Sequence, residues 1–391
     1  MEGNAVFINF WYVAAESGEV IFGAEKPLKV QMLGQRFALW RDSKGVVRCV
    51  SDTCTHRSGS LADGRIRRDC IECPYHGWTF NADGACVRIP SLGPDAKIPD
   101  RTRVDAYPVV EKYGLVHVFL GDLPEAERPE ILPIPEFDDA SWRFIVLKMD
   151  WQIDYKRSVE NTMDPAHNEF THPTHGFLGV REDYKVDEVT LIDKPWGTGF
   201  LNRMYAPPLP NRDMHEASGR SGDDYATGGA GNHGPNTTWT YIHISDKAWM
   251  HGYAFHTPIT EKLDRIYVLF GRNYLTDPKY DNTIQQRGNF IAEQDRYVLE
   301  PVHPKLTPSH NAHEFLVPAD KAIGRYREYC RDWEERGWRI DVAKVRADED
   351  RVAYAIPSPG RRQAKSWVMP AIPVVAAPER AAARRRSAGQ E

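Results

Sequence analysis

Short apolar runs separated by turn residues fill the N-terminal third of the chain. The runs at 46–50, 78–80 and 115–120 are flanked by Gly, Asp, Ser or Asn residues, as in the turn at 81–84. Apolar runs of this length with such punctuation predict short β-strands. We therefore expect a small antiparallel β domain at the start of the chain.

A proline-rich segment at 124–135, read as a linker or an extended crossover, separates this region from one with longer elements. There the sequence predicts a strand at 143–149 and a helix at 151–163, with Asp150 as the N-cap of the helix. Later apolar runs predict three strands and two long helices, at 239–245, 250–255, 265–272, 283–300 and 319–335. A sheet meander with long helices before and after it is an α+β pattern.

Length and these patterns divide the 391 residues into three segments. We expect a β domain at 1–135, a larger α+β domain at 136–345 and a C-terminal extension at 346–391. The end of the extension is rich in Ala and Arg without an apolar period, so we expect it to be partly disordered. Residues 211–236 are rich in Gly, Asn, Asp and Ser, which predicts a mobile surface loop of the kind that often forms a lid.

Composition narrows the possible partners and the location. A formal net charge of −5, with no obvious basic face, argues against nucleic acid as the main partner. No apolar stretch approaches the roughly 20 residues that cross a bilayer, and the apolar run at 10–15 lacks the flanks of a signal peptide. We therefore expect a cytoplasmic protein that binds neither membrane nor nucleic acid. In such a chain, the clustering of five cysteines at 49–86 favours metal binding over disulfide bonds.

Two mixed pairs of metal ligands lie in that cluster. Cys54 and His56 are separated by one residue, and Cys73 and His76 by two. Turn residues accompany each pair, so two loop tips would each present one thiolate and one imidazole. Two thiolates on one iron and two imidazoles on the other make up the ligand set of a Rieske 2Fe–2S centre. A tetrahedral zinc site is the alternative, although zinc sites usually bring two cysteines together in one pair.

A second dense polar group lies at 161–172. Four residues separate His167 from His172, so both can face one side across a helix end or a turn. Two imidazoles and one carboxylate form the facial triad of oxygen-activating ferrous enzymes, which leaves coordination positions open beside the substrate. Taken alone, the group is better explained as a solvated or capping turn, but an iron–sulfur site upstream favours the metal.

The third ligand of this site has to come from elsewhere in the chain. We choose Asp295, which lies on the predicted helix at 283–300. Two further carboxylates of the same helix are competitors, and each is better explained as a surface residue: Glu293 and Glu300.

The two groups resemble the motifs of one enzyme family, the ring-hydroxylating Rieske non-haem iron oxygenases (α subunits). The pattern at 54–78 resembles the Rieske motif, the pattern at 161–172 looks like the mononuclear iron motif, and the segment around Asp295 is similar to the distal aspartate motif. One departure is Thr55, where many members have proline; it is not a ligand. The resemblance is carried by Cys54, His56, Arg57, Cys73, His76, Gly77 and Trp78 and by Asn161, Asp164, His167, His172 and Asp295.

The resemblance implies a fold and an assembly. It implies a Rieske β domain with a 2Fe–2S cluster, followed by a helix-grip catalytic domain with mononuclear Fe(II). It also implies a head-to-tail homotrimer, because the two metals of one subunit are too far apart for fast electron transfer. In such a trimer Asp164, which the resemblance groups with Asn161 among the catalytic residues, bridges a cluster histidine of one subunit to His167 of its neighbour.

The activity that the resemblance implies is that of a terminal oxygenase, which uses dioxygen and electrons from NAD(P)H. We expect hydroxylation or oxidative O- or N-demethylation of a small aromatic or heteroaromatic substrate; cis-dihydroxylation is the alternative, and a non-enzymatic Rieske electron carrier fits the second iron motif less well. The string at 229–234 matches G-x-G-x-x-G but lacks the strand and helix of a Rossmann turn, so we consider it accidental. The reductase is therefore expected to be a separate polypeptide, with or without an intervening ferredoxin.

The strands at 239–256 hold several aromatic residues and histidines. Alternating positions on one strand face can line an apolar pocket that has a few hydrogen-bond donors. Among these positions, His243 and His256 are our candidates for holding a carboxylate or phenolate of the substrate. A satisfied structural histidine is the alternative at both positions.

Overall fold

A computed structural model describes residues 5–173, 179, 182–205, 216, 225–308, 313–364 and 366–377. These residues form two compact units. The first unit combines the described residues of Gly3–Pro129 and Trp333–Glu391, and the second those of Glu130–Asp332.

Three small antiparallel sheets make up the first unit, as the punctuated apolar runs predict. The run at 115–120 is strand β11 (Leu115–Leu120), every residue of which is buried. The other strands are β1 (Phe10–Glu16), β2 (Leu28–Met32), β3 (Gln35–Arg41), β4 (Val47–Ser51), β5 (Arg65–Arg67), β6 (Cys70–Glu72), β7 (Thr79–Phe80), β8 (Cys86–Arg88), β9 (Ala106–Tyr107) and β10 (Val109–Lys112). Short 3-10 helices lie at Ser17–Glu19, Pro90–Leu92 and Glu125–Glu127.

The C-terminal segment packs onto this first unit, so compactness divides the chain differently from the sequence pattern. Ile340 N donates to Val6 O (2.8 Å), and the hydroxyl of Tyr107 donates to Ile356 O (2.7 Å). The buried carboxylate of Asp105 accepts from the guanidinium of Arg361 (2.7 Å). Helices α6 (Val342–Ala347) and α7 (Gly360–Gln363) belong to this segment. Disorder was predicted for the end of the C-terminal extension. Residues 378–391 of that segment lie outside the described part of the chain.

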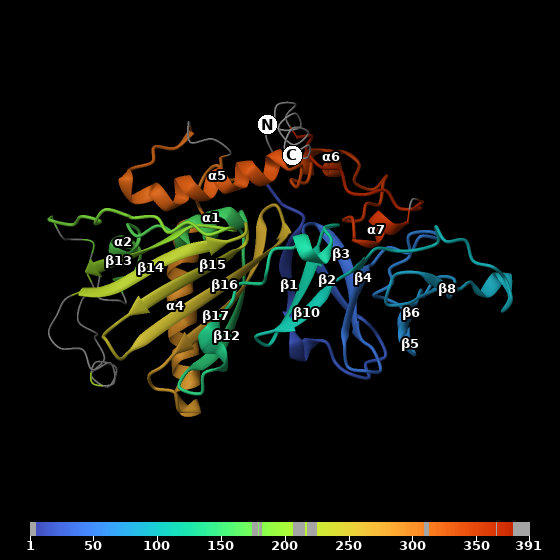
Figure 1. The fold of residues 1–391 in the computed structure, drawn as a ribbon, viewed down its shortest axis with the longest axis horizontal. Helices are drawn as coiled ribbons and strands as arrows, with labels where there is room; N and C mark the ends of the chain where they lie inside the picture. The colour runs from blue at the N-terminus through green and yellow to red at the C-terminus, as the bar shows by residue number, and fades with distance from the viewer. Residues whose placement is uncertain are drawn as a thin grey trace. The chain divides into compact units, whose positions relative to one another are not determined.

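The second unit is built on one antiparallel sheet of six strands in the order β12-β17-β16-β15-β14-β13 (Figure 1). Its strands are β12 (Arg143–Trp151), β13 (Gly199–Tyr205), β14 (Tyr225–His233), β15 (Thr237–His243), β16 (Trp249–Thr260) and β17 (Leu263–Arg272). Its helices are α1 (Tyr155–Thr162), α2 (Asn168–Thr171), α4 (Asp281–Leu299) and α5 (Lys321–Glu335), with 3-10 turns η4 (Pro135–Asp138), η6 (Pro278–Tyr280) and η8 (Pro318–Asp320).

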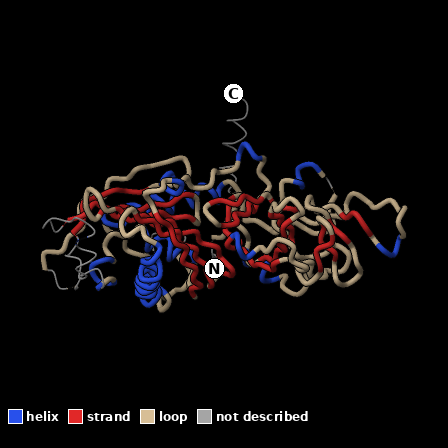
Figure 2. Tube along the Cα trace, turned by 90° about the horizontal axis from the view of Figure 1, so that it is seen from below, coloured by secondary structure: helices blue, strands red, loops and turns tan. Residues whose placement is uncertain are grey.

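The long helix α4 lies against one side of this sheet in both views (Figures 1 and 2). The α+β class and the predicted strands and long helices are therefore confirmed, with ends that shift by a few residues. Among the described residues, no helix combines the length and the apolar character that a membrane crossing requires.

The predicted start of the helix at 151–163 is wrong. Strand β12 continues to Trp151, and Asp150 in this strand forms an ion pair with Arg265 of β17 (2.7 Å). The helix begins at Tyr155, and Asp154 is its N-cap, accepting from Lys156 N (3.1 Å). Pairing with β17 keeps the backbone extended past the first aspartate, so the second one caps the helix.

The predicted surface loop at 211–236 is also wrong where the structure describes it. Residues 225–233 form β14, an inner strand between β13 and β15, and the rest of the predicted loop lies largely outside the described residues. The glycines here provide close approach rather than flexibility, because a Cβ on Gly231 would overlap Thr198 O and the ring of Trp239. The G-x-G-x-x-G string thus forms part of a strand and a turn. It is not a dinucleotide-binding loop, as the sequence context indicates.

We predict that Gly231→Ala destabilises the second unit, because the added methyl group has to displace backbone and an indole ring. The expected loss in free energy of unfolding is about 1–3 kcal/mol, measured by denaturant titration. Gly252→Ala in β16 is the matched control, since its Cβ would meet only Thr240 Cβ at 3.9 Å. Equal effects of the two substitutions would contradict the close-packing explanation.

Candidate metal centres

The four residues of the first predicted site lie on two loops with matching backbone geometry. Cys54 accepts a main-chain hydrogen bond from Ser58 N (2.9 Å), and Cys73 accepts one from Gly77 N (3.0 Å). Ser58 and Gly77 both have positive φ, at 56° and 68°. Each loop therefore makes a similar tight turn that ends four residues after its cysteine.

The thiols and imidazoles of these loops face opposite environments. Cys54 and Cys73 are 1% and 3% exposed within the core of the unit, whereas His56 and His76 are exposed to solvent. The two imidazole rings meet with centroids 4.4 Å apart, and the thiols are close enough for a hydrogen bond that raises the pKa of Cys54 and lowers that of Cys73. One pair of sulfur donors thus lies inside and one pair of nitrogen donors outside.

This separation fits a two-iron cluster better than one zinc ion. Ligand atoms on a single tetrahedral zinc lie within about 4 Å of one another. Among the described residues, only His167, His172 and Asp295 bring three such ligand atoms within 4.8 Å of one another, and the cysteine loops do not. Two sulfurs on one iron and two nitrogens on a second iron satisfy the observed arrangement.

The residues packed around the loops fix the rings and leave little space. The ring of His56 stacks on Trp78, with centroids 4.4 Å apart and 4° between the planes. A Cβ at Gly59 would lie 3.1 Å from the sulfur of Cys73, so a larger residue there would press on the thiol. Cys86 is buried in the same core cluster as Cys54 and Cys73 and forms no disulfide bond.

His167, His172 and Asp295 form the second group. His167 precedes α2 and His172 follows it, while Asp295 lies in the last turns of α4. The two Nε2 atoms are 3.2 Å apart and lie 3.6 and 3.3 Å from Asp295 Oδ1. Three ligand bonds of about 2.1 Å at right angles place their ends about 3 Å apart, so these atoms fit three neighbouring positions of one metal ion.

Hydrogen bonds orient each member of this group. Nδ1 of His172 contacts Gln294 Oε1 (3.0 Å), and Nδ1 of His167 contacts the main-chain oxygen of Asp164 (2.6 Å). Both partners are acceptors, so each Nδ1 carries the proton and each Nε2 keeps its lone pair for a metal. Asn161 Nδ2 donates to Asp295 Oδ1 (3.0 Å) and fixes the carboxylate. Sequence reasoning assigned Gln294 no role, although it is next to Asp295.

The other sequence candidates near this group have different partners. The carboxylate of Asp164 accepts from Ala166 N (2.7 Å), and burial raises its pKa. Glu293 forms an ion pair with Arg296 (2.9 Å), and Glu300 accepts from Gln152 N (3.0 Å). Neither competitor of Asp295 joins the three-residue group.

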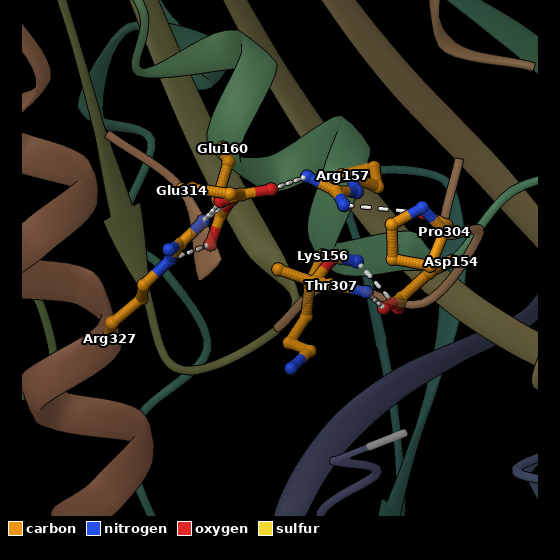
Figure 3. A network of polar contacts seen from close by, with 8 residues as sticks. All are labelled: Asp154, Lys156, Arg157, Glu160, Pro304, Thr307, Glu314 and Arg327. Carbon is orange, nitrogen blue, oxygen red and sulfur yellow. Dashed lines mark hydrogen bonds and ion pairs between the residues drawn. The ribbon is translucent and has the colours of Figure 1, made fainter. Parts of the chain in front are cut away.

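A buried ion network holds α1, which carries Asn161, against α5 (Figure 3). Arg327 of α5 makes two hydrogen bonds of 2.7 Å to the carboxylate of Glu160 and one of 2.6 Å to Glu314. Glu314 also accepts from Arg157 of α1 (2.6 Å). Burial raises the pKa of Glu160, and the adjacent guanidinium of Arg327 opposes that shift. The charge pairs thereby fix the helix turn just before Asn161.

A cavity of about 240 Å³ opens beside the three-residue group. It is mostly apolar and includes His167, His172 and Asp295 in its wall. The sheet contributes alternate residues, as strand geometry requires. These are Thr238, Thr240, Ile242, Met250, Gly252, Ala254, His256, Ile266, Val268 and Phe270, with Leu147, Met149 and Trp151 from β12.

Of the two predicted substrate histidines, only His256 lines this cavity. His243 occupies an odd position of β15 and lies on the opposite face of the sheet with Trp239 and Tyr241. His256 is 1% exposed, and its Nδ1 contacts Asp264 Oδ2 at 2.7 Å. Its Nε2 is buried and has no hydrogen-bond partner among the described atoms.

Each of the two units matches a domain of known proteins. The Rieske [2Fe-2S] domain matches residues 10–112, and the vanillate O-demethylase oxygenase C-terminal domain matches residues 151–336. The iron-sulfur subunit TsaM1 of the toluene-4-sulfonate monooxygenase system of Comamonas testosteroni is 38% identical over 193 residues, covering 49% of this chain and 53% of its own. The 5,5'-dehydrodivanillate O-demethylase oxygenase subunit of Sphingobium sp. is 31% identical over 173 residues, covering 42% and 38%. The matched part of the chain thus spans about half of the length of these curated relatives, or less.

Solved structures share the fold over most of the chain. Pseudomonas putida CBB5 NdmA with caffeine has a TM-score of 0.68 and 22% identity, covering 83% of this chain and 90% of that one. Dicamba monooxygenase bound to dicamba has a TM-score of 0.66 and 22% identity, covering 84% and 98%. Both units therefore have the architecture that the sequence pattern predicts.

We predict that Arg327→Met destabilises the protein strongly, because it leaves the buried carboxylate of Glu160 without its main partner. The expected loss is about 3–5 kcal/mol in the free energy of unfolding. The control is Arg325→Met on the same helix, where the exposed ion pair with Asp193 contributes about 0–1 kcal/mol. Similar losses in the two variants, measured by denaturant titration, would contradict the role of the buried network.

Proposed function

We propose, since this chain belongs to the Rieske-type non-haem iron oxygenases, that it is the terminal oxygenase of a multicomponent system. The observation that supports this best is the meeting of His167, His172 and Asp295 at the wall of an apolar cavity. A site that only transferred electrons would not need a cavity beside a second metal group. The electron-carrier alternative is therefore less consistent with the structure.

In this proposal, the two groups of side chains hold different cofactors. Cys54, His56, Cys73 and His76 hold the 2Fe–2S cluster, and His167, His172 and Asp295 hold one Fe(II). When both are bound, the cluster supplies single electrons and the iron activates dioxygen beside the substrate.

The chain's other residues prepare the mononuclear site. Gln294 and the main chain of Asp164 keep both ligand imidazoles in the tautomer with a free Nε2. Asn161 holds the Asp295 carboxylate, and the apolar wall keeps bulk water away from the open positions.

We propose hydroxylation or oxidative O- or N-demethylation of a small aromatic or heteroaromatic acid. An apolar cavity of about 150 Å³ is known to accept benzene, so the observed cavity of about 240 Å³ suits one substituted ring. Two relatives are named for toluene-4-sulfonate and 5,5'-dehydrodivanillate, both aromatic acids. A 3-chlorobenzoate-3,4-dioxygenase subunit, 34% identical over 166 residues, makes cis-dihydroxylation the second candidate.

His256 is the residue that we propose for binding the acid group. Its Nδ1 is held by Asp264, so the ring is fixed with Nε2 in the cavity wall. With Nδ1 facing Asp264 Oδ2, the ring presents its Nε2 edge to the cavity, where an Nε2–H can donate to a carboxylate, sulfonate or phenolate oxygen of the substrate. Apart from the indole N–H of Trp151, the other sheet residues of the cavity are apolar or bear only a hydroxyl or thioether, so the contact with His256 would orient the ring of the substrate.

The partners follow from the family. We propose that a separate NAD(P)H-dependent reductase, with or without a ferredoxin, supplies electrons, and that a homotrimer brings the cluster of one subunit to the mononuclear iron of the next. In that trimer, Asp164 is proposed to bridge the two sites. We also propose a cytoplasmic location, consistent with six free cysteines.

The purified chain is expected to contain about three iron ions, two in the cluster and one mononuclear. We predict that His167→Ala and Asp295→Ala each lose about one iron and abolish reductase-coupled product formation, while the EPR signal of the reduced cluster is kept. Glu293→Ala, two residues from Asp295 on α4, is the control and is expected to keep all three iron ions. Zinc in place of iron, or loss of the cluster signal in His167→Ala, would refute the two-site proposal.

Replacement of His256 is expected to weaken binding of aromatic acids. His256→Leu removes one hydrogen bond to a charged group, which corresponds to an increase in Kd of about 10- to 100-fold for benzoates or benzenesulfonates. The corresponding benzamides, which are neutral, should bind the variant and the parent with similar affinity. The double variant His256→Leu/Asp264→Leu avoids an unpaired buried carboxylate and should show the same discrimination. Unchanged affinity for all the acids would exclude His256 from their binding.

A further inference from the structure

A second pair of histidines meets on the face of the sheet opposite the cavity. His243 on β15 and His251 on β16 have their Nε2 atoms 3.2 Å apart, the same separation as in the His167 and His172 pair. In the β15–β16 register, His251 lies opposite Tyr241, which places the two histidines diagonally on one face. Neither lines the cavity. We propose that His243 and His251 form a peripheral binding site for one divalent transition-metal ion such as Zn²⁺ or Cu²⁺.

A carboxylate fixes the tautomer that a metal needs. Nδ1 of His251 contacts Glu136 Oε1 of η4, and the hydroxyl of Tyr253 donates to the same oxygen. Because an ionised carboxylate only accepts, Nδ1 of His251 carries the proton and its Nε2 presents a lone pair toward His243. A carboxylate behind a ligand histidine is the arrangement that orients metal-bound imidazoles in proteins. The side chain of Glu136 is itself only 10% exposed, and both contacts converge on its Oε1.

Aromatic rings hold both imidazoles in place. Trp249 stacks on His243 with centroids 4.6 Å apart and 22° between the planes. Trp142 and Tyr241 pack against His251, with centroids at 4.6 and 4.1 Å. Rings fixed in this way lose little conformational freedom when a metal binds. His251 is buried, whereas His243 is half-buried beside the partly exposed Trp249, so an ion can reach the pair from solvent.

The type of donor atom, imidazole nitrogen, determines which metal ions the pair would bind. Neutral imidazoles suit Cu²⁺, Zn²⁺ and Ni²⁺, and Cu²⁺ binds most tightly in the general order of affinities. Among the described residues, no third His, Cys, Asp or Glu completes a three-ligand group here, so water would fill the remaining positions. The site is therefore weaker than the proposed iron site and independent of it.

Equilibrium dialysis of the iron-loaded protein against Zn²⁺ tests the proposal. The parent should take up about one zinc ion per chain beyond its iron, with the iron content unchanged. His243→Ala should lose this zinc and keep its iron, and the more conservative His243→Gln should do the same. Glu136→Gln should keep the site but weaken it about 10- to 100-fold, because only the orienting carboxylate is lost. His313→Ala, which removes an exposed histidine elsewhere in the chain, is the control and should bind zinc like the parent.

Cu²⁺ provides an independent spectroscopic readout. With Cu²⁺ alone as the probe, the parent should show nitrogen hyperfine splitting from two imidazoles, and His243→Ala should not. A simple hydrogen bond between the two rings predicts no stoichiometric metal uptake. Absence of uptake, or equal uptake by the parent and His243→Ala, would overturn the proposal. Neither result depends on catalytic turnover.

Discussion

Two adjacent residues of α1 connect a buried charge to the proposed iron site, and the position of α1 depends on both contacts. Glu160 faces the guanidinium of Arg327, whereas Asn161 donates to the carboxylate of Asp295. A buried carboxylate without a partner is costly, so α1 has to keep the position in which Arg327 and Glu160 meet. That same position brings Asn161 to α4. The ion pair between Glu160 and Arg327 therefore helps to fix the direction of the Asp295 carboxylate, a proposed metal ligand.

The first unit differs, because its proposed ligands are close in sequence and need only two similar turns. The hydrogen bonds from Ser58 to Cys54 and from Gly77 to Cys73 close these turns locally. Packing then separates the donors, with sulfur in the core and imidazole at the surface. Local geometry is sufficient for this site, whereas the mononuclear site depends on segments far apart in the chain.

This contrast explains how much could be predicted from the sequence. Spacing predicted the four cysteine and histidine candidates of the first site and the pair His167 and His172, and Asp295 was chosen on its predicted helix; the structure brings the last three together. Gln294 and Arg327 were not found, because their partners lie 122 and 167 residues away and no local pattern marks the contacts. Asp150 was predicted as the helix cap, whereas Asp154 is the cap in the structure, because strand pairing with β17 is a tertiary effect that the local sequence does not show.

The misplacement of His243 has a separate cause. The alternation of side chains between the two faces of β15 was predicted correctly. The sequence did not determine which of the two sets faces the cavity. Large aromatic residues at odd positions suggested a pocket, whereas the even positions that line the cavity include small side chains such as Thr240 and Gly252. Likewise, the glycines of β14 suggested a loop because composition cannot show that Trp239 packs against them. In both cases, the structural role of a residue depended on the side chains packed around it, which the residue type alone does not show.

The alternation that lines the cavity also constrains how the protein can evolve. Even-numbered positions of β15, β16 and β17 face the cavity, while their odd-numbered neighbours pack on the other side. A point substitution such as a change at Ala254 would alter the cavity and leave the opposite face intact. A one-residue insertion or deletion within these strands would exchange the two faces from that point onward. New substrate ranges in this lineage should therefore arise by substitution within the strands, with changes in length confined to the loops between them.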